Sequence, residues 1–168
     1  QTKVHQTLTL NGENSKYAPK LLLWNPGKTN DMLVVENKSY DNLTHRRSVF
    51  FIEKKYFIIV DEAFGNATGN IDLHFQLAPG TAVFNHNELM VTSGFDEGWN
   101  VMVRTQEQQG LEMSEEEGQV SFLYTKKEPR PAFLYRINKT QADSNIRFVT
   151  LVAPYEKEIP KVKIRIVA

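Results

Sequence analysis

Hydrophobic residues recur with a period close to two along almost the whole chain, and no run of ten or more residues has a helical period. Clusters of Gly, Pro, Asn and Asp separate the apolar runs, as is typical of strands joined by turns. The pattern predicts strands at Lys3–Leu10, Lys20–Trp24, Met32–Tyr40, Leu43–Ile52, Tyr56–Phe64, Asn70–Leu77, Ala82–Phe84, Glu88–Thr92, Asn100–Gln106, Gly118–Thr125, Ala132–Asn138, Ile146–Ala153 and Lys161–Val167. Glu107–Glu117 is interpreted as an acidic connector or a weak strand.

Turn signals support this division. Asn11-Gly12 is typical of a type I′ hairpin, and Asn25-Pro26-Gly27 and Ala78-Pro79-Gly80 each close a strand. Glu53–Lys55 joins two runs that are apolar on both sides of the pleat, which favours central strands covered on both faces by a second sheet or an adjoining domain. The sequence therefore predicts an all-β fold: a multi-stranded antiparallel β-sandwich, jelly-roll-like, of two or more stacked sheets and about 12 to 13 strands.

Composition narrows the class of protein. A chain of 168 residues fits one domain, and we expect residues 1–168 to form a single β-sandwich domain. The formal net charge is zero, which argues against a nucleic-acid binder, and no apolar run is long enough to span a membrane. There is no cysteine, so four N-x-S/T sequons, at Asn37, Asn42, Asn66 and Asn138, are interpreted as turn chemistry in a bacterial chain.

Three segments carry a resemblance to a known family. They are HQTLTLNG (His5–Gly12), HRRSVFFIEKKYFIIVDE (His45–Glu62) and IDLHFQLAPG (Ile71–Gly80). Their order and spacing resemble the β-sandwich part of the heparinase II/III family of polysaccharide lyases, and Gln6 favours the heparinase III branch, which acts on heparan sulfate. The chain begins inside a strand-like segment, so we expect it to be the C-terminal part of a larger enzyme.

The resemblance implies an enzyme of two parts, an N-terminal α/α toroid and a C-terminal β domain, with the substrate cleft between them. The implied reaction is β-elimination at a uronic acid of a sulfated glycosaminoglycan, in the bacterial periplasm or outside the cell. In the family an Asn, a Tyr and a His provide the catalytic groups, all upstream of this segment. We therefore expect no catalytic residue in this chain, and no activity from this part alone.

His5 is the one functional residue that the resemblance carries over. It matches the last of three ligands to a divalent metal, calcium or zinc, whose other two ligands lie upstream. Alternation places His5 on the polar face of its predicted strand with Thr7 and Thr9, where an imidazole reaches a metal without disturbing the core. The alternative is a solvent-facing side chain. A single ligand does not hold a metal strongly, so we expect none bound to this part alone.

Other side chains suggest contacts with an anionic sugar. Arg46 and Arg47 can each grip a sulfate or carboxylate with two parallel hydrogen bonds, with Lys54-Lys55 nearby in the predicted hairpin. Trp24 and Trp99 lie beside turns, where a ring can stack on a pyranose. The alternatives are a solvated strand start for the arginines and packing anchors for the tryptophans.

Three further patterns have structural interpretations. His74 is interpreted as a hydrogen-bonded sandwich histidine rather than a contact to the upstream domain. Asp61 and Glu62 are adjacent in a strand and point to opposite faces, which excludes a glycosidase pair. Lys161, Lys163 and Arg165 share one face of the last predicted strand, as in edge-strand protection.

Two functions of other classes remain open from the sequence. A non-catalytic carbohydrate-binding module would use Trp24 and Trp99 to bind glycan. A structural or adhesive sandwich would bind none.

Overall fold

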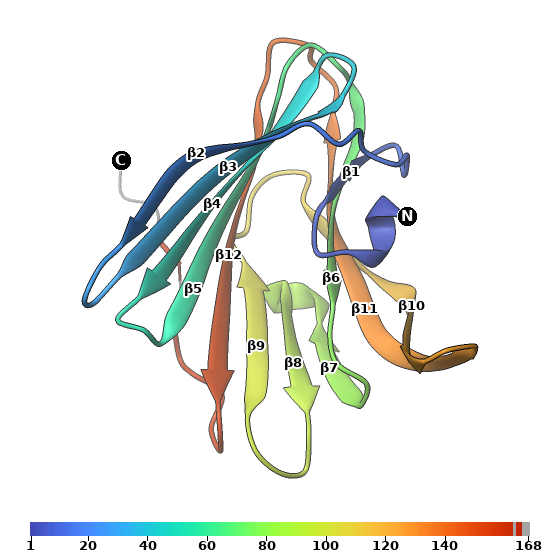
Figure 1. Cartoon of the computed structure of the whole chain (residues 1–168). Coiled ribbons are helices and arrows are strands. Elements are labelled where there is room, and N and C mark those ends of the chain that lie inside the picture. The colour runs from blue at the N-terminus through green and yellow to red at the C-terminus, as the bar shows by residue number, and fades with distance from the viewer. Residues whose placement is uncertain (163, 166–168) are drawn as a thin grey trace.

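The chain folds into two antiparallel sheets, which confirms the predicted all-β sandwich (Figure 1). The computed structural model describes residues 1–162 and 164–165. Its strands are β1 (Leu8–Leu10), β2 (Pro19–Pro26), β3 (Asp31–Tyr40), β4 (Leu43–Ile52), β5 (Tyr56–Phe64), β6 (Gly69–Gln76), β7 (Thr81–Asn85), β8 (Met90–Gly94), β9 (Asn100–Thr105), β10 (Glu112–Leu123), β11 (Lys126–Lys139) and β12 (Ile146–Tyr155). Two short 3-10 helices are η1 (Thr2–Val4) and η2 (His86–Glu88). No helix in the described part has the length and apolar character needed to cross a bilayer.

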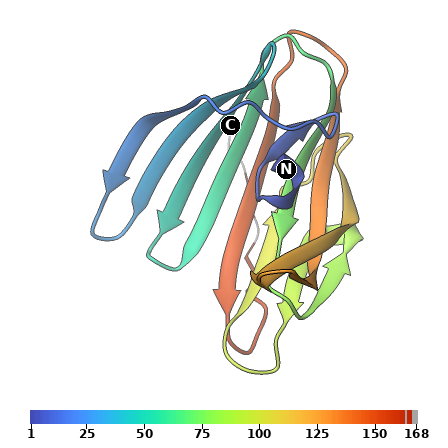
Figure 2. The same ribbon diagram turned by 45° about the vertical axis from the view of Figure 1, so that its right-hand side comes forward.

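The larger sheet has the strand order β2-β3-β4-β5-β12-β9-β8-β7, and the smaller one β1-β6-β11-β10. The chain changes sheet after β1, β5, β6, β9 and β11, so the two sheets are woven together. In Figures 1 and 2 the smaller sheet faces the β5–β12–β9–β8–β7 half of the larger one, and β2, β3 and β4 extend away from it.

The main core lies between the two sheets and is centred on aromatic rings. Phe133 stacks on Phe75 within the smaller sheet at 5.4 Å between centroids, and meets the edge of Phe84 on β7 of the larger sheet at 6.1 Å. Tyr135 is fully buried, and its hydroxyl donates to the carbonyl of Leu89 at 2.8 Å. Such aromatic pairs favour offset or edge contacts, and here they join the two layers.

A second, smaller core covers the opposite face of the larger sheet. Met102, Leu151 and Ala153 are buried there, and Val162 and Ile164 from the C-terminal segment pack against them. The run Phe50–Ile52 in β4 is only half-buried, because β2, β3 and β4 reach beyond the smaller sheet. The expectation that both faces of β4 are covered is therefore met only in part.

Several predicted boundaries change. Lys3–Leu10 is not one strand, because Thr2–Val4 form η1 and β1 starts at Leu8. Glu88 belongs to η2, and Leu89 in the left-handed region (φ 50°) separates it from β8. The segment Glu107–Glu117 is divided: residues 107–111 form a connector, and β10 begins at Glu112 and pairs with β11.

Asn11-Gly12 forms a turn but no hairpin. Both residues have positive φ (51° and 72°), and the amide of Glu13 donates to the carbonyl of Leu10 at 3.0 Å. The strands on either side belong to different sheets, since β1 pairs with β6 and the Asn11 side chain accepts from the amide of Asn70. The local turn chemistry was right, and the pairing partner was wrong.

The strand predicted at Lys161–Val167 falls in part on residues outside the described ranges, including Lys163. Its described members, Lys161, Val162, Ile164 and Arg165, are in no strand.

Candidate functional site

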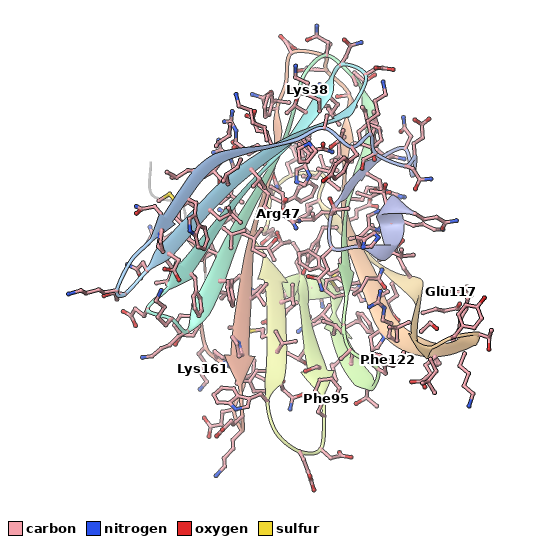
Figure 3. The ribbon with its side chains drawn as sticks, in the orientation of Figure 1. Lys38, Arg47, Phe95, Glu117, Phe122 and Lys161 are labelled. Carbon is pink, nitrogen blue, oxygen red and sulfur yellow. The ribbon has the colours of Figure 1, made fainter. Side chains whose placement is uncertain are left out.

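A hollow of about 780 Å³ lies between the N-terminal segment and the hairpin of β10 and β11. We call it the N-terminal hollow; it is lined by Gln1, Lys3, Val4, His5, Gln6, Gln76, Glu117, Gln119, Val120, Ser121, Lys127 and Arg130. Figure 3 shows Glu117 on this hairpin, at the right-hand side of the molecule. The lining combines cations with amides and a hydroxyl, and volumes of about 300–1,000 Å³ are typical of ligand sites.

Hydrogen bonds from three side chains hold the N-terminal segment over the smaller sheet. Gln6 Nε2 donates to the carbonyl of Gln76 at 2.9 Å, and Gln76 Nε2 donates to the carbonyl of Lys3 at 3.3 Å. An Arg130 Nη donates to the carbonyl of Val4 at 3.2 Å. Two of these bonds end on backbone carbonyls of the segment, and the third comes from its own Gln6 side chain, so the wall of the hollow is ordered from both sides.

Two buried polar atoms in the lining have no hydrogen-bond partner among the described residues. They are Arg130 Nε, a donor, and Gln76 Oε1, an acceptor. Buried polar atoms in folded proteins are almost always paired, so two orphans in one hollow are unusual.

His5 lies in this hollow with its side chain exposed. Within the described ranges no group of three or more His, Cys, Asp or Glu side chains is placed to hold a metal. The hollow itself contributes His5 and Glu117. These donors are too few for a complete metal site, so any metal here needs ligands from elsewhere.

Arg46 and Arg47 both have carboxylate partners. Arg46 Nε donates to Glu36 at 2.8 Å, and its guanidinium lies 5.0 Å from the centre of the Phe64 ring. Arg47 binds Asp61 through two nitrogens, at 2.7 and 3.2 Å. The structure thus gives each arginine a structural role beside the predicted sugar contact.

Asp61 is the centre of a buried charge cluster. The residue is fully buried, and His45 Nε2 donates to its Oδ1 at 2.6 Å. Burial acts to raise the pKa of Asp61, but Arg47 and His45 outweigh it, and the pKa is lowered from its usual range. Arg47 also donates to the carbonyl of Gln6 at 2.6 Å, so the cluster anchors the N-terminal segment to the larger sheet (Figure 3).

Glu62 lies on the other side of the strand, where it accepts from Arg147 at 2.8 Å. Glu62 and Asp61 therefore lie on opposite faces of the strand, as predicted, and cannot act together as the carboxylate pair of a glycosidase. The Asp61 carboxylate is fully buried and committed to internal partners, which leaves it unsuited to acid–base chemistry on a polymer.

His74 is a buried structural histidine, as expected. Its Nδ1 donates to Glu116 at 2.7 Å, and its Nε2 accepts from the hydroxyl of Thr9 at 2.9 Å, the tautomer that an ionised Glu116 requires. Glu116 reaches His74 across β11, over the small side chain of Ala132.

The two tryptophans are exposed and come from distant elements. Trp24 lies on β2 at the sheet edge, and Trp99 follows β8 in the loop to β9. β2 and β9 are five strand steps apart, about 24 Å at ~4.8 Å per step. Trp99 borders a hollow of about 570 Å³ with Lys54, Lys55, Tyr56 and Pro154. The structure does not bring Trp24 and Trp99 into one binding surface.

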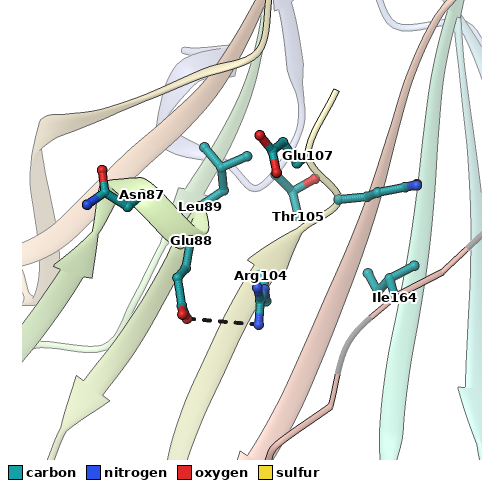
Figure 4. A pocket seen from close by; sticks show the side chains of 8 residues that line it. Asn87, Glu88, Leu89, Arg104, Thr105, Glu107 and Ile164 are labelled. Atoms are coloured by element: carbon teal, nitrogen blue, oxygen red, sulfur yellow. Dashed lines mark ion pairs between the residues drawn. The ribbon is translucent and has the colours of Figure 1, made fainter. Parts of the chain in front are cut away.

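A further hollow, of about 350 Å³, is shown in Figure 4. Arg104 lies 3.9 Å from Glu88 there, and Glu107 adds a second carboxylate. Because these carboxylates offset its cation, this hollow is a poor site for an anionic polymer.

The N-terminal hollow was not found from the sequence. Gln76, Lys127 and Arg130 come from β6 and β11, and only the pairing of these strands brings them to the N-terminal segment. The one local signal for this hollow was the pair of prolines, Pro129 and Pro131, that flank Arg130. Each proline restricts the backbone next to the arginine.

Comparison with known proteins gives consistent results. The family model described as "Heparinase II/III-like, C-terminal" matches residues 1–164. The heparin-sulfate lyase of Pedobacter heparinus is 39% identical over 168 residues, which is 98% of this chain and 25% of that protein. The heparin-sulfate lyase of Bacteroides stercoris is 37% identical over 155 residues, covering 92% of this chain and 23% of that protein. The chain therefore spans about a quarter of the length of the curated relatives that it matches.

Solved structures agree with the sequence matches. The crystal structure of the heparan sulfate lyase HepC from Pedobacter heparinus has a TM-score of 0.91 at 38% identity, over 95% of this chain and 25% of that one. A crystal structure of heparinase III has a TM-score of 0.86 at 35% identity, over 92% of this chain and 24% of that one. From its sequence and its fold alike, this chain belongs to the heparinase II/III-like family, as a C-terminal β-sandwich domain.

Proposed function

We propose that this chain is the C-terminal part of a heparan-sulfate lyase that cleaves a uronate-containing glycosaminoglycan by β-elimination, and that it forms one wall of the substrate cleft. The single observation that carries the proposal is the match over almost the whole chain, at 39% identity, to a heparin-sulfate lyase. The match at a TM-score of 0.91 supports it. No observation favours the carbohydrate-binding module as a separate function.

β-Elimination needs three groups around the uronate: one that neutralises its carboxylate, a base that removes the C5 proton, and an acid that protonates the departing oxygen. The buried histidines of this chain are poorly suited to these roles, because His45 is bound to Asp61 and His74 to Glu116. The proposal therefore assigns the catalytic groups to the upstream part of the parent protein, in its N-terminal toroid.

The surface of β2 supports a further domain next to this one. Four consecutive residues of this edge strand are each at least 40% exposed: Leu21, Leu22, Leu23 and Trp24. Successive strand residues point to opposite faces, so apolar side chains are exposed on both faces of β2, and an unpaired edge strand invites association. We propose that the upstream part of the parent chain covers it.

We expect the full-length parent protein to release unsaturated uronate from heparan sulfate, and residues 1–168 alone to release none, because the catalytic groups are upstream. Absorbance of the unsaturated product measures both. Alginate serves as the comparison substrate, since it carries uronate without sulfate. A full-length protein that cleaves no uronate-containing glycan contradicts the proposal.

We also propose that His5 supplies one of three ligands to a calcium or zinc ion in the parent protein. Its exposed side chain in the N-terminal hollow is free of the internal bonds that occupy His45 and His74. The bacterial relatives and the extracellular nature of the polymer support a periplasmic or secreted location.

His5→Ala is expected to remove about one metal ion per chain from the full-length protein, because a site with two remaining ligands binds weakly. Elemental analysis after gel filtration measures the ratio. His86→Ala is the matched control, since His86 is exposed on η2 and lies outside the N-terminal hollow. Equal metal content in the two variants rules out His5 as a ligand.

A further inference from the structure

We propose that the N-terminal hollow is a subsite for one acidic sugar unit of the glycosaminoglycan, in which Arg130, Lys127 and Lys3 bind the anionic group and Gln76 and Gln119 bind hydroxyls. This inference rests on the proposed function and adds to it the residues that bind the polymer.

The hollow carries an excess of positive charge. Lys3, Lys127 and Arg130 line the hollow with Glu117 as the one carboxylate among its lining residues, an excess of two positive charges with His5 neutral. None of these cations is in an ion pair within the part of the chain that the structure describes. Four arginines elsewhere are paired: Arg46 with Glu36, Arg47 with Asp61, Arg136 with Asp72 and Arg147 with Glu62. The chain as a whole has a formal net charge of zero, so the hollow concentrates unpaired positive charge, which attracts a polyanion.

Two buried polar atoms of the lining lack hydrogen-bond partners among the described residues. Arg130 uses one nitrogen for the carbonyl of Val4, and its Nε has no partner among the described residues. Gln76 uses its Nε2 for the carbonyl of Lys3, and its Oε1 is left as an unpaired acceptor. Sulfate or carboxylate oxygens satisfy the donor, and a sugar hydroxyl satisfies the acceptor. Both orphan atoms belong to side chains that line the hollow.

The remaining lining includes uncharged polar side chains that suit a sugar. Gln6, Gln119 and Ser121 carry amides and a hydroxyl, which both donate and accept, as sugar hydroxyls require. The described lining residues include no Phe, Tyr or Trp, so recognition here relies on polar contacts rather than on stacking against such a ring. A ligand with hydroxyls and an anionic group on one unit matches this lining better than a simple anion.

The test uses the full-length parent protein and heparan-sulfate hexasaccharide. Arg130→Gln is expected to raise KM about ten-fold and Lys127→Gln about three-fold, with kcat within about two-fold of wild type, because the contacts bind the polymer away from the scissile bond. Arg130→Lys should recover part of the loss, since it keeps the charge without the guanidinium geometry. The matched controls are Arg147→Gln and Lys28→Gln, which remove one cation each from other surfaces and should leave KM unchanged.

A chemically desulfated hexasaccharide distinguishes the two sources of negative charge. If the KM effect of Arg130→Gln disappears with this substrate, the subsite binds a sulfate; if it persists, the subsite binds the uronate carboxylate. Both outcomes support the proposal.

Two results separate its failure from that of the proposed function. A wild-type protein that does not cleave the hexasaccharide overturns the proposed function itself. A wild-type protein that cleaves it, with an unchanged KM in Lys127→Gln and in the Arg130→Gln Lys127→Gln double variant, overturns the subsite alone. Lys127 makes no hydrogen bond to the N-terminal segment among the described contacts, so its variant tests binding without displacing that segment.

Discussion

Asp61→Asn is expected to lower the free energy of unfolding of this chain by about 3–5 kcal/mol, the usual cost of breaking a buried ion pair from one side. The Asp61 carboxylate accepts from His45 at 2.6 Å and from Arg47 at 2.7 and 3.2 Å, and it is fully buried. An amide in its place keeps the shape but leaves the Arg47 charge uncompensated inside the protein. The hydrogen bond from Arg47 to the carbonyl of Gln6 would weaken with it.

Urea unfolding followed by tryptophan fluorescence measures this change. The control is Glu62→Gln, one residue along the same strand, where the carboxylate pairs with the largely exposed Arg147. Exposed pairs contribute little, so the control should change stability by less than about 1 kcal/mol. A similar small change in both variants would show that the buried cluster does not stabilise the fold.

The same cluster predicts a pH dependence of stability. Although burial acts to raise the pKa of Asp61, Arg47 and His45 lower it overall. A carboxyl with a lowered pKa in the folded state stabilises the fold fully above its unfolded pKa of about 4. That contribution is lost as the pH falls through the lower, folded pKa. Wild-type stability should therefore fall below about pH 4 more steeply than that of Asp61→Asn.

Phe133→Ala is expected to cost about 3–5 kcal/mol, in the range of large-to-small changes in tightly packed cores. The ring is fully buried and contacts Phe75 at 5.4 Å, Tyr135 at 5.6 Å and Phe84 at 6.1 Å between centroids. Phe84 belongs to the larger sheet, so the lost ring leaves a cavity at the contact between the two layers. Surrounding rings cannot close it without shifting a strand.

Phe122→Ala provides the matched comparison, because Phe122 lies on the neighbouring β10 and is 68% exposed. Its removal should change the urea midpoint by less than a tenth of the Phe133 effect. Equal losses in the two variants would mean that the packing between the sheets contributes no more than surface contacts do.

The strongest local patterns were predicted with correct limits. Leu43–Ile52 and Tyr56–Phe64 form β4 and β5 as expected, because long β-branched and aromatic runs meet at a turn in which Glu53 and Lys54 adopt positive φ. The partner of β1 was not predictable in this way. Its pairing with β6 joins residues more than sixty positions apart, and the Asn11-Gly12 turn fixes only the direction of the chain at that point.

The acidic segment at the start of β10 shows the same limit. Alternation there is weak on its own, and the strand is stabilised by its pairing with β11 and by the bond from Glu116 to His74. β11 follows directly in the sequence, but His74 is 42 positions away from Glu116.

The amino-acid sequence alone was enough to predict the all-β class, most of the strands and the family. The alternation of apolar residues and the spacing of the three family-like segments are properties of the sequence itself. Only the folded structure determined which cations lack a carboxylate partner among the described residues. Arg46 and Arg47 stand out in the sequence, yet strand pairing sets Glu36 and Asp61 beside them. By contrast, nothing in the sequence singles out Lys3, Lys127 and Arg130, yet the fold brings them together in one hollow. The physical reason is that charge pairing acts over a few ångströms in space, and contacts between strands distant along the chain determine those distances.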